Sequence, residues 1–356
     1  MPADLDQLLE GSSRTFALTI PLLPEPTRRE VTVAYLLFRL ADTLEDGEAW
    51  SRDRRARGLR ALEGLLVQAQ VEAQEAAAQA ALATPGATAE QVLDEALNEA
   101  PGEADEPLDG AVARFADELR RDPPTAHAGY LALNHAAPEV FRALRALAPR
   151  AREVVLRHLL VTTRGMAEGL EQEGGTAGAA GGDGLRLRSL GQLRRYCYLV
   201  AGVVGEMLTE LFLLDAPIDP AGESALAAAA ATLRTHARAF GEGLQLTNIL
   251  KDQGDDAREQ RHFVPEAVER RSLFALARQD LADAARYVGA LLAARAPEGL
   301  VAFTALPVRL ALDTLAAVEA RGAGAKVSRE QLALAMDEVS GMLRGERRLE
   351  AVLRTG

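Results

Sequence analysis

The stretch QLTNILKDQGDDAREQRHFVP, Gln245–Pro265, combines an apolar helical pattern with a row of acidic side chains. Its carboxylates are Asp252, Asp255 and Asp256. Their spacing of three and four residues places them on one face of an α-helix. Gln245 and Asn248 extend this polar stripe, beside the apolar residues Leu246, Ile249 and Leu250. The stretch therefore predicts an amphipathic helix that ends in an acidic motif.

A second acidic motif with the same spacing lies near the N-terminus, in the segment ADTLED. Its carboxylates are Asp42, Glu45 and Asp46. The pattern predicts a helix over residues 28–46 with Gly47 as its left-handed cap. Tyr35 and Arg39 precede Asp42 on the same face. The last helical turn disfavours negative charge by about 0.3–1 kcal/mol, and sequences often break such a local rule at functional sites.

Two matched acidic triads are harder to attribute to ordinary solvated helix surface than one alone. Carboxylate oxygens suit Mg²⁺, with Mn²⁺ as the alternative ion. The sequence lacks the Glu-x-x-His pairs of a di-iron bundle, and its one cysteine, Cys197, excludes a cysteine-rich zinc site. We expect the two triads to face each other across a cleft and to hold divalent metal.

The composition favours packed helices. Apolar residues make up 48% of the 356 residues but aromatic residues only 4%, and Ala and Leu dominate. A formal net charge of −12 argues against a nucleic-acid partner. Neither a signal peptide nor an uncharged apolar run of about 18 residues is present, which predicts a soluble protein without a membrane span. We expect a cytoplasmic monomer.

The pattern along the chain predicts one all-α domain over residues 1–356, a helical bundle with a central cleft. A long helix is expected to begin near Ser224 and to carry the acidic motif at its end. The other predicted helices cover 28–46, 51–67, 111–122, 125–135, 138–147, 150–171, 189–212, 272–294, 299–319 and 328–352. Residues 68–107 are expected to form an Ala- and Glu-rich surface insertion, partly helical. The glycine-rich residues 174–184 predict either a connector or a lid.

The polar residues outside the acidic motifs suit an anionic substrate. Basic side chains accompany both motifs, namely Arg39, Lys251, Arg258 and Arg261. Tyr35 and Tyr196 can form an aromatic wall that stabilises a cation. Cys197 falls on an apolar helix and is expected in the core. This inventory fits ionisation of a diphosphate ester, with metal at the leaving group and apolar walls that exclude water from a carbocation.

Six successive segments resemble the squalene/phytoene synthase family. They are SSRTFALTI, YLLFRLADTLED, GMAEGL, YCYLVAGVVGEMLTELF, GLQLTNILKDQGDDAREQRHFVP and FTALPVRLALDTLAA. They occur in the family's order and cover most of the chain outside residues 68–107. The resemblance implies an all-α isoprenoid synthase fold and head-to-head joining of two prenyl diphosphates.

The resemblance also implies roles for individual residues. The metal ligands would be Asp42, Glu45, Asp46, Asp252 and Asp256, with Asp255 as a further acid beside them. The substrate contacts would be Ser13, Arg14, Arg39, Gln245, Asn248, Lys251, Arg261 and Phe303. Tyr35 and Tyr196 would lie near the reacting carbons, with Tyr196 as the candidate for proton abstraction. Asn248 and Lys326 would contact the cofactor, with Phe303 and Lys326 at the far end of the pocket.

The resemblance leaves the last step of the reaction open. In squalene synthases a hydride from NADPH quenches the final cation, whereas in phytoene and dehydrosqualene synthases proton loss does so. Thr43 after Asp42 resembles squalene synthases, and DQGDDAREQRHFVP is closer to the phytoene type. Lys251 departs from the arginine that is usual before the second motif, and so it loses a bidentate fork. The sequence favours squalene formation from farnesyl diphosphate over use of geranylgeranyl diphosphate, and an oily product predicts peripheral membrane contact.

Two other readings compete with a head-to-head synthase. A chain-elongating prenyl synthase or terpene cyclase shares the all-α class, but its usual motif begins with two consecutive acids, whereas Thr43 follows Asp42 here. A helical scaffold without enzymatic activity would carry its acids only for solvation. The matched polar stripes and the acids at the end of the helix over 28–46 argue against a scaffold.

Overall fold

The structure is a computed structural model that describes residues 4–13, 16–82, 107–174, 185–216 and 225–354. Every regular element within these ranges is a helix, and the one β pairing among them is an isolated parallel bridge between Arg186 and His262. The predicted all-α class is confirmed. Contacts cluster in two compact units, which consist of Met1–Ser13 with Thr32–Glu171 (unit 1) and Arg14–Val31 with Gln172–Gly356 (unit 2).

Unit 1 holds the first acidic motif, at the end of α3. Its helices are α1 (Leu5–Ser12), α3 (Thr27–Glu45, from Thr32 onward), α4 (Arg52–Leu82), α6 (Leu108–Arg121), α7 (Ala128–His135), α8 (Ala137–Arg145) and most of α9 (Pro149–Gly174). Helix α7 packs against α1 and α6. The backbones of α1 and α7 approach so closely that a Cβ at Gly129 would overlap the carbonyl oxygen of Gly11. Glycine at these positions therefore determines how near the two helices lie.

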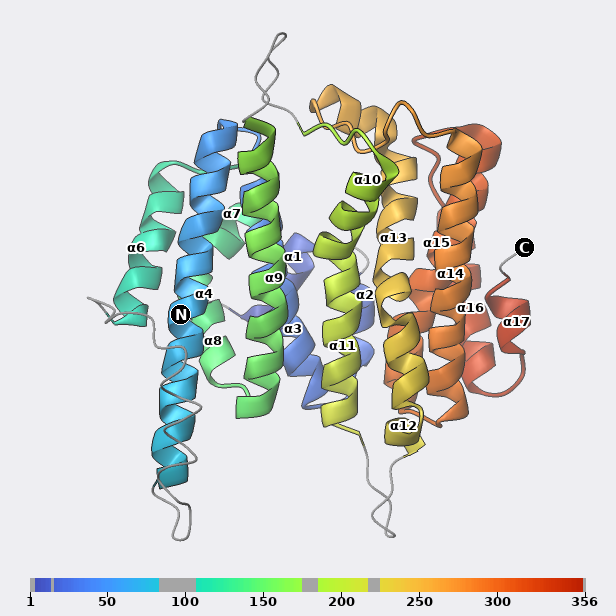
Figure 1. The fold of residues 1–356 in the computed structure, drawn as a ribbon. Coiled ribbons are helices and arrows are strands. Elements are labelled where there is room, and N and C mark those ends of the chain that lie inside the picture. The colour runs from blue at the N-terminus through green and yellow to red at the C-terminus, as the bar shows by residue number, and fades with distance from the viewer. Residues whose placement is uncertain (1–3, 14–15, 83–106, 175–184, 217–224, 355–356) are drawn as a thin grey trace. The chain divides into compact units, whose positions relative to one another are not determined.

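Unit 2 holds the second acidic motif, at the end of α13. Its elements are α2 (Phe16–Thr19), η1 (Ile20–Leu22), α10 (Leu190–Cys197), η2 (Tyr198–Gly202), α11 (Val203–Leu214), α12 (Ala225–Ala228), α13 (Ala230–Arg258), α14 (Arg270–Ala293), α15 (Glu298–Arg321), α16 (Arg329–Leu343) and α17 (Leu349–Val352). Helices α11, α13, α14 and α15 lie side by side (Figure 1). Segment η2 is a π-helix between α10 and α11.

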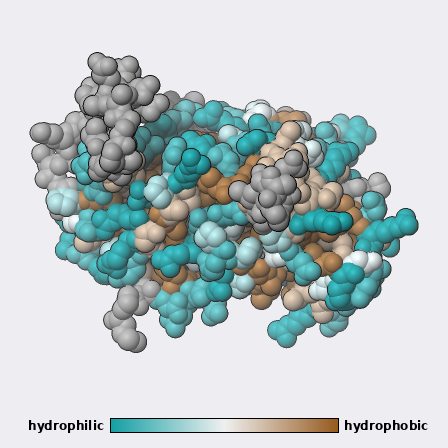
Figure 2. Space-filling view, turned by 90° about the horizontal axis from the view of Figure 1, so that it is seen from below, coloured by the Kyte–Doolittle hydropathy of each residue, from teal (hydrophilic) through white to brown (hydrophobic). Residues whose placement is uncertain are grey.

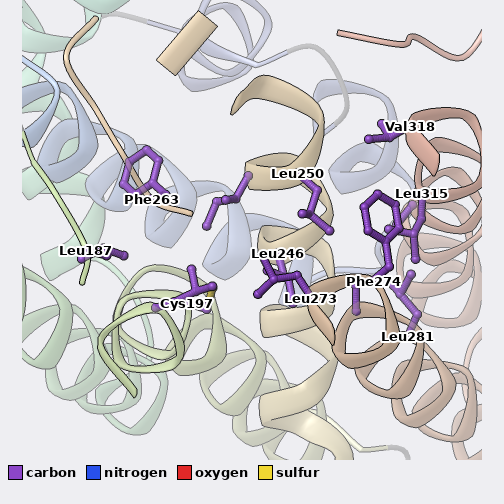
Figure 3. Close-up of a cluster of buried hydrophobic side chains, with 14 of the residues drawn as sticks. Leu187, Cys197, Leu246, Leu250, Phe263, Leu273, Phe274, Leu281, Leu315 and Val318 are labelled. Atoms are coloured by element: carbon purple, nitrogen blue, oxygen red, sulfur yellow. The ribbon is translucent and has the colours of Figure 1, made fainter. Parts of the chain in front are cut away.

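A cluster of buried apolar side chains surrounds the C-terminal half of α13. Figure 3 shows Leu246 and Leu250 of α13 between two groups of partners: Leu187, Cys197 and Phe263 on one side, and Leu273, Phe274, Leu281, Leu315 and Val318 on the other. Burying one such leucine or phenylalanine contributes about 1.5–3 kcal/mol. The apolar face predicted for this helix is therefore the face that packs, which leaves the stripe of Asn248 and Asp252 exposed or half-exposed.

The structure corrects several predicted boundaries. Helix α4 continues to Leu82, so residues 68–82 belong to it, and residues 83–106 of the expected insertion lie outside the described residues. The predicted helix over 328–352 is two helices, because the chain turns at Gly345 with φ of 75°. The helix predicted over 189–212 contains the π-helix, which apolar periodicity did not indicate. Residues 175–184 of the glycine-rich stretch also lie outside the described residues.

Gly47 was wrongly predicted as a left-handed cap. Its φ is not among the positive values of the described glycines. A Cβ at Gly47 would lie 3.1 Å from the Cβ of Pro124, and the carbonyl oxygen of Pro124 accepts the N–H of Ala49 at 3.2 Å. The glycine thus permits close approach of residues 47–49 to the loop at Pro124.

Two helical stretches of unit 2 are long and apolar enough to span a membrane by length and composition alone. They are Leu190–Leu214 and Glu298–Arg321, with 50% and 61% of their apolar windows buried inside the protein. The core helices of a folded domain show the same length and composition. The face drawn in Figure 2 is mainly hydrophilic, with small apolar areas between polar side chains.

Candidate active site

The first acidic motif begins with a ladder of contacts on α3. Tyr35 donates its hydroxyl to the carbonyl oxygen of Ser12 at 3.2 Å, and its oxygen accepts hydrogen bonds from Nε and Nη2 of Arg39 at 3.3 and 3.2 Å. Arg39 also lies 3.3 Å from Asp42 and 5.6 Å from the ring centroids of both Tyr35 and Tyr130. The arginine is thus held between two aromatic rings and the first carboxylate, so its charge is fixed at one place.

The pKa of Asp42 is raised to about 6. Burial is the main cause, the neighbouring Asp46 raises it further, and Arg39 opposes both effects. The pKa of Arg39 is also raised, because Asp42 and Tyr35 outweigh the effect of burial. The first motif therefore carries a carboxylate whose charge one arginine compensates only in part.

The remaining carboxylates of the first motif differ in exposure. Glu45 is 8% exposed, and its backbone carbonyl accepts a hydrogen bond from Nη1 of the buried Arg55 at 3.0 Å. Asp46 is exposed. Arg55 places a positive charge at the C-terminal end of α3, where a helix favours it. This contact offsets part of the unfavourable position of the acids.

The second acidic motif pairs every carboxylate with a basic side chain. Nζ of Lys251 lies 3.1 Å from Asp252, and Arg261 lies 3.2 Å from Asp256. Asp255 pairs with Arg258. Asp256 is nevertheless 9% exposed, and burial raises its pKa to about 6, with Asp252 raising it and Arg261 lowering it.

The chain leaves α13 through a tight turn that returns Arg261 to the acids. Gln260 adopts φ of 59°, and the N–H of Arg261 donates to the carbonyl oxygen of Asp256 at 2.8 Å. His262 then pairs with the segment after the glycine-rich stretch, because its N–H donates to Leu185 at 2.7 Å and its carbonyl accepts from Leu187 at 2.9 Å. These bonds hold residues 261–263 across the end of the helix.

Tyr196 lies beside the second motif. Its ring centroid is 4.7 Å from that of Phe263, and the guanidinium of Arg261 lies 6.0 Å from the Phe263 ring. A small cavity of about 60 Å³ is lined in part by Asp256, Arg261 and Phe263. Within unit 2, the structure therefore brings a tyrosine, an arginine and two aspartates of the predicted set to one place.

The predicted cofactor residue Lys326 and the predicted pocket residue Phe303 lie at opposite ends of α15. Lys326 is exposed in the α15–α16 loop, where the N–H of Gly324 donates to the carbonyl oxygen of Lys251 at 2.7 Å. Phe303 lies in the second turn of α15, 1% exposed, between Phe16 and Phe212 at 6.3 and 6.2 Å. Most of α15, roughly 27 Å at 1.5 Å per residue, separates the two. Lys326 therefore lies near the second motif and far from Phe303 along α15, and the pocket and cofactor roles of both residues stay predictions.

The remaining predicted substrate-binding residues are Gln245 and Asn248 on α13, and Ser13 and Arg14 near the N-terminus. Gln245 is half-buried and Asn248 exposed, and Oδ1 of Asn248 accepts a hydrogen bond from Nζ of Lys251 at 3.4 Å. Ser13 follows α1 as its C-cap. Arg14 lies outside the described residues.

Within each motif, the carboxylates fit Mg²⁺ as a partial ligand set and not as a closed cage. Within the described part of the chain, no group of three or more His, Cys, Asp or Glu side chains is arranged to hold a metal ion. Mg²⁺ in proteins commonly takes one or two carboxylates together with waters and substrate phosphates. The raised pKa values of Asp42 and Asp256 show buried negative charge that a cation would relieve. Their oxygen donors therefore suit the ion.

Two residues that contact charged side chains, Glu242 and Tyr130, were not predicted from the sequence. Glu242 is fully buried on α13 and contacts Arg194 and Arg238. One signal was present, because Glu242 occupies the apolar face of the predicted helix, four residues before Leu246. Tyr130 on α7 gave no such signal, since only the tertiary structure brings it to Arg39.

Comparisons with known proteins identify the family and the fold of the chain. Residues 9–336 match the squalene/phytoene synthase family. Phytoene synthase 3 of Zea mays is 43% identical over 81 residues, which are 23% of this chain and 17% of that protein. The phytoene synthase of Thermus thermophilus is 40% identical over 81 residues, 23% of each chain. Squalene synthase clz20 of Cochliobolus lunatus is 36% identical over 90 residues, 24% of this chain and 19% of that protein.

The segments matched in these three relatives thus span about a fifth of each relative's length. The fold is similar throughout to a squalene synthase, TcSQS, solved with the ligand BPH1237. The TM-score is 0.63 at 19% identity, with 99% of this chain and 97% of that chain covered. The TcSQS complex with E5700 gives the same TM-score at 18% identity. Since the family match extends over most of its length, the chain belongs to the squalene/phytoene synthase family.

Proposed function

We propose that this protein joins two molecules of farnesyl diphosphate head to head, through a cyclopropylcarbinyl diphosphate, to give squalene with reduction by NADPH. The observation that carries the proposal is the pair of acidic motifs, each with a buried or half-buried aspartate of raised pKa. Family membership supports it, because the matched region, residues 9–336, includes both motifs.

The residues of the first motif suit binding of a diphosphate. Arg39, fixed by Tyr35 and Tyr130, offers a cation that does not have to be ordered on binding. Bound Mg²⁺ would supply positive charge to the leaving diphosphate, with Asp42, Glu45, Asp46, Asp252, Asp255 and Asp256 as the candidate ligands. The Tyr35 ring beside Arg39 presents a face to positive charge, which suits an allylic cation.

The residues of unit 2 suit the second half of the reaction. Tyr196 and Phe263 form an aromatic pair next to Arg261, so a carbocation near them would meet two ring faces while the released diphosphate meets the guanidinium. The Tyr196 oxygen is the candidate acceptor for a proton. Buried Phe303, with Phe16 and Phe212, provides apolar surface that excludes water.

The positions of Asn248 and Lys326 support a reductive end of the reaction. Both lie near Lys251, through the Asn248 hydrogen bond and through Gly324 of the Lys326 loop. Exposed Lys326 and half-buried Lys251 suit the phosphates of NADPH, which would supply a hydride to the last cation. The second candidate function is phytoene or dehydrosqualene formation without NADPH, and the phytoene synthases among the relatives favour it.

The test is incubation of the full chain with farnesyl or geranylgeranyl diphosphate and Mg²⁺, with and without NADPH, followed by product analysis. Squalene from farnesyl diphosphate only in the presence of NADPH supports the proposal. A conjugated C30 product regardless of NADPH, or turnover of the C20 substrate alone, would establish the second candidate instead. No product from either substrate would overturn both.

A further inference from the structure

Four charged side chains meet inside unit 2 at the junction of three helices. They are Arg194 on α10, Arg238 and Glu242 on α13, and Asp280 on α14. Arg194 pairs with both carboxylates, through Nη2 to Glu242 and through Nη1 to Asp280. Nε of Arg238 donates to the other oxygen of Glu242 at 2.6 Å. The Glu242 side chain is fully buried and that of Asp280 is 6% exposed, whereas those of Arg194 and Arg238 are 28% and 49% exposed, so two buried carboxylates pair with guanidinium groups that reach the surface.

Such a network is not needed for stability alone. Removing two charges from water costs several kcal/mol per ion, and well-packed apolar side chains in their place are often equally stable. Burial raises the pKa of Glu242 and of Asp280 here, which shows that the desolvation cost is present. The specific geometry of these ion pairs therefore suggests a role other than stabilisation of the fold.

The backbone next to the network indicates what these contacts could position. Helix α10 has eight residues and passes straight into the π-helix η2. A π turn holds one residue more than an α turn, so the side chains of α10 do not lie where a continuous α-helix with α11 would place them. The π-helix itself is fixed against α13, because a Cβ at Gly241 would overlap the carbonyl oxygen of Ala201. Helix α10 has no comparable backbone contact among those of the described glycines.

The network contacts one face of α10, and the Tyr196 side chain lies on the opposite face. Arg194 and Tyr198 are four residues apart and share a face. Arg194 pairs with Glu242, and the guanidinium of Arg238 lies 4.6 Å from the ring centroid of Tyr198. Tyr196 lies two residues from each, which places it on the opposite side of the helix. There its ring packs on Phe263, next to the second acidic motif.

We propose that the ion network of Arg194, Arg238, Glu242 and Asp280 is a positioning device that sets the rotation of α10 and so holds the Tyr196 ring against Phe263. None of these residues belongs to the substrate-binding or catalytic set proposed above. Their effect on turnover rests on the proposed function of Tyr196, whereas their effect on the Tyr196 ring does not.

The same two long helices provide a matched control. His236 of α13 lies 3.2 Å from Asp283 of α14, which also contacts Arg286. This pair links α13 to α14 as Glu242 and Asp280 do through Arg194, but its ion pairs, His236–Asp283 and Asp283–Arg286, lie on α13 and α14 and not on α10. Asp283→Asn therefore removes a carboxylate between the same helices while the four side chains of the network keep their ion-pair partners.

The first test follows the tyrosine rings and needs no activity. The chain has five tyrosines, so protein labelled with 3-fluorotyrosine gives few ¹⁹F NMR signals, and Tyr196→Phe assigns the one from residue 196. Asp280→Asn and the charge-balanced double variant Arg194→Gln/Asp280→Asn, in which Glu242 keeps Arg238, should shift or broaden that signal, while Asp283→Asn leaves it unchanged. The double variant avoids an unpaired buried charge, and circular dichroism checks that each variant folds. An unchanged Tyr196 signal in both folded variants would overturn the proposal.

The second test separates positioning from general damage. With farnesyl diphosphate, Asp280→Asn should lower kcat at least about tenfold, because displacement of a reacting group by 1 Å can cost about 100-fold. KM should stay within about threefold, since the diphosphate-binding groups are untouched. In the Tyr196→Phe background, Asp280→Asn should lower kcat little further. Full additivity of the two effects would contradict the proposal, whereas an inactive wild-type protein would overturn the proposed function and leave the NMR result to decide the network.

Discussion

The two acidic motifs share a sequence spacing but differ in how their charge is balanced. In the first, Asp42 pairs with Arg39, and Glu45 is buried at the end of α3. In the second, Asp252, Asp255 and Asp256 each pair with a basic side chain of their own, Lys251, Arg258 and Arg261. Nothing in the spacing of the acids distinguishes these two states.

This difference in ion pairing predicts a different role for each acidic motif. A cation at the first motif would relieve repulsion between Asp42 and Asp46 directly. A cation at the second would compete with three ion pairs, and the released side chains would then be available to a diphosphate. We therefore expect the first motif to depend more on metal, and the second to couple metal binding to binding of the anion.

The largest effect is expected from removing one carboxylate from each motif. Asp42→Ala and Asp252→Ala should each lower turnover by at least about 100-fold while the fold is retained, as loss of a group that stabilises transition-state charge does. Steady-state kinetics and circular dichroism measure both properties. Wild-type activity in either variant would contradict the assignment of that carboxylate to the metal.

Thermal unfolding with metal and a diphosphate analogue comes next in size. A ligand at 100 times its Kd stabilises the folded state by about 2.7 kcal/mol. We expect Mg²⁺ and the analogue together to raise Tm more than either ligand alone. We also expect the rise in Tm caused by Mg²⁺ alone to be smaller in Asp42→Asn than in Asp252→Asn. Equal loss in the two variants would show that the motifs do not differ as proposed.

The pH dependence of stability sharpens the comparison further. Folding raises the pKa of Asp42 from its ordinary value to about 6, so between these values the folded state binds more protons than the unfolded state. This contribution to stability is therefore lost as pH rises through about 6. Without metal, Tm should fall between pH 5 and 7, and less in Asp42→Asn. A slope that is the same in both proteins would exclude Asp42 as the cause.

The smallest effect should come from the two arginines at the second motif. Arg258 pairs with Asp255 at the exposed surface, with side chains 79% and 57% exposed, and such pairs contribute about 0.2–1 kcal/mol or less. Arg261, 20% exposed, contacts the buried Asp256. Arg258→Ala should leave Tm and KM almost unchanged, whereas Arg261→Ala should raise KM for farnesyl diphosphate. The reverse order, measured by the same kinetics, would assign the diphosphate to Arg258.

The local features of both motifs were predictable because helical periodicity is a property of neighbouring residues. The apolar positions Leu246, Ile249 and Leu250 pack as predicted, and Arg39 lies against Asp42 since the two are three residues apart. The buried Glu242 had a signal in its apolar position, but its partner Asp280 comes from another helix, so no local pattern pairs them.

The sequence by itself determined the all-α class, the two acidic motifs and the family, because these depend on periodicity and on residues in fixed order. The tertiary structure decided what surrounds each acid. It placed Tyr130 on Arg39, Tyr196 on Phe263 and the Lys326 loop on Lys251. These contacts join residues far apart in the chain, and burial, which sets the pKa values of Asp42 and Asp256, exists only once the helices have packed.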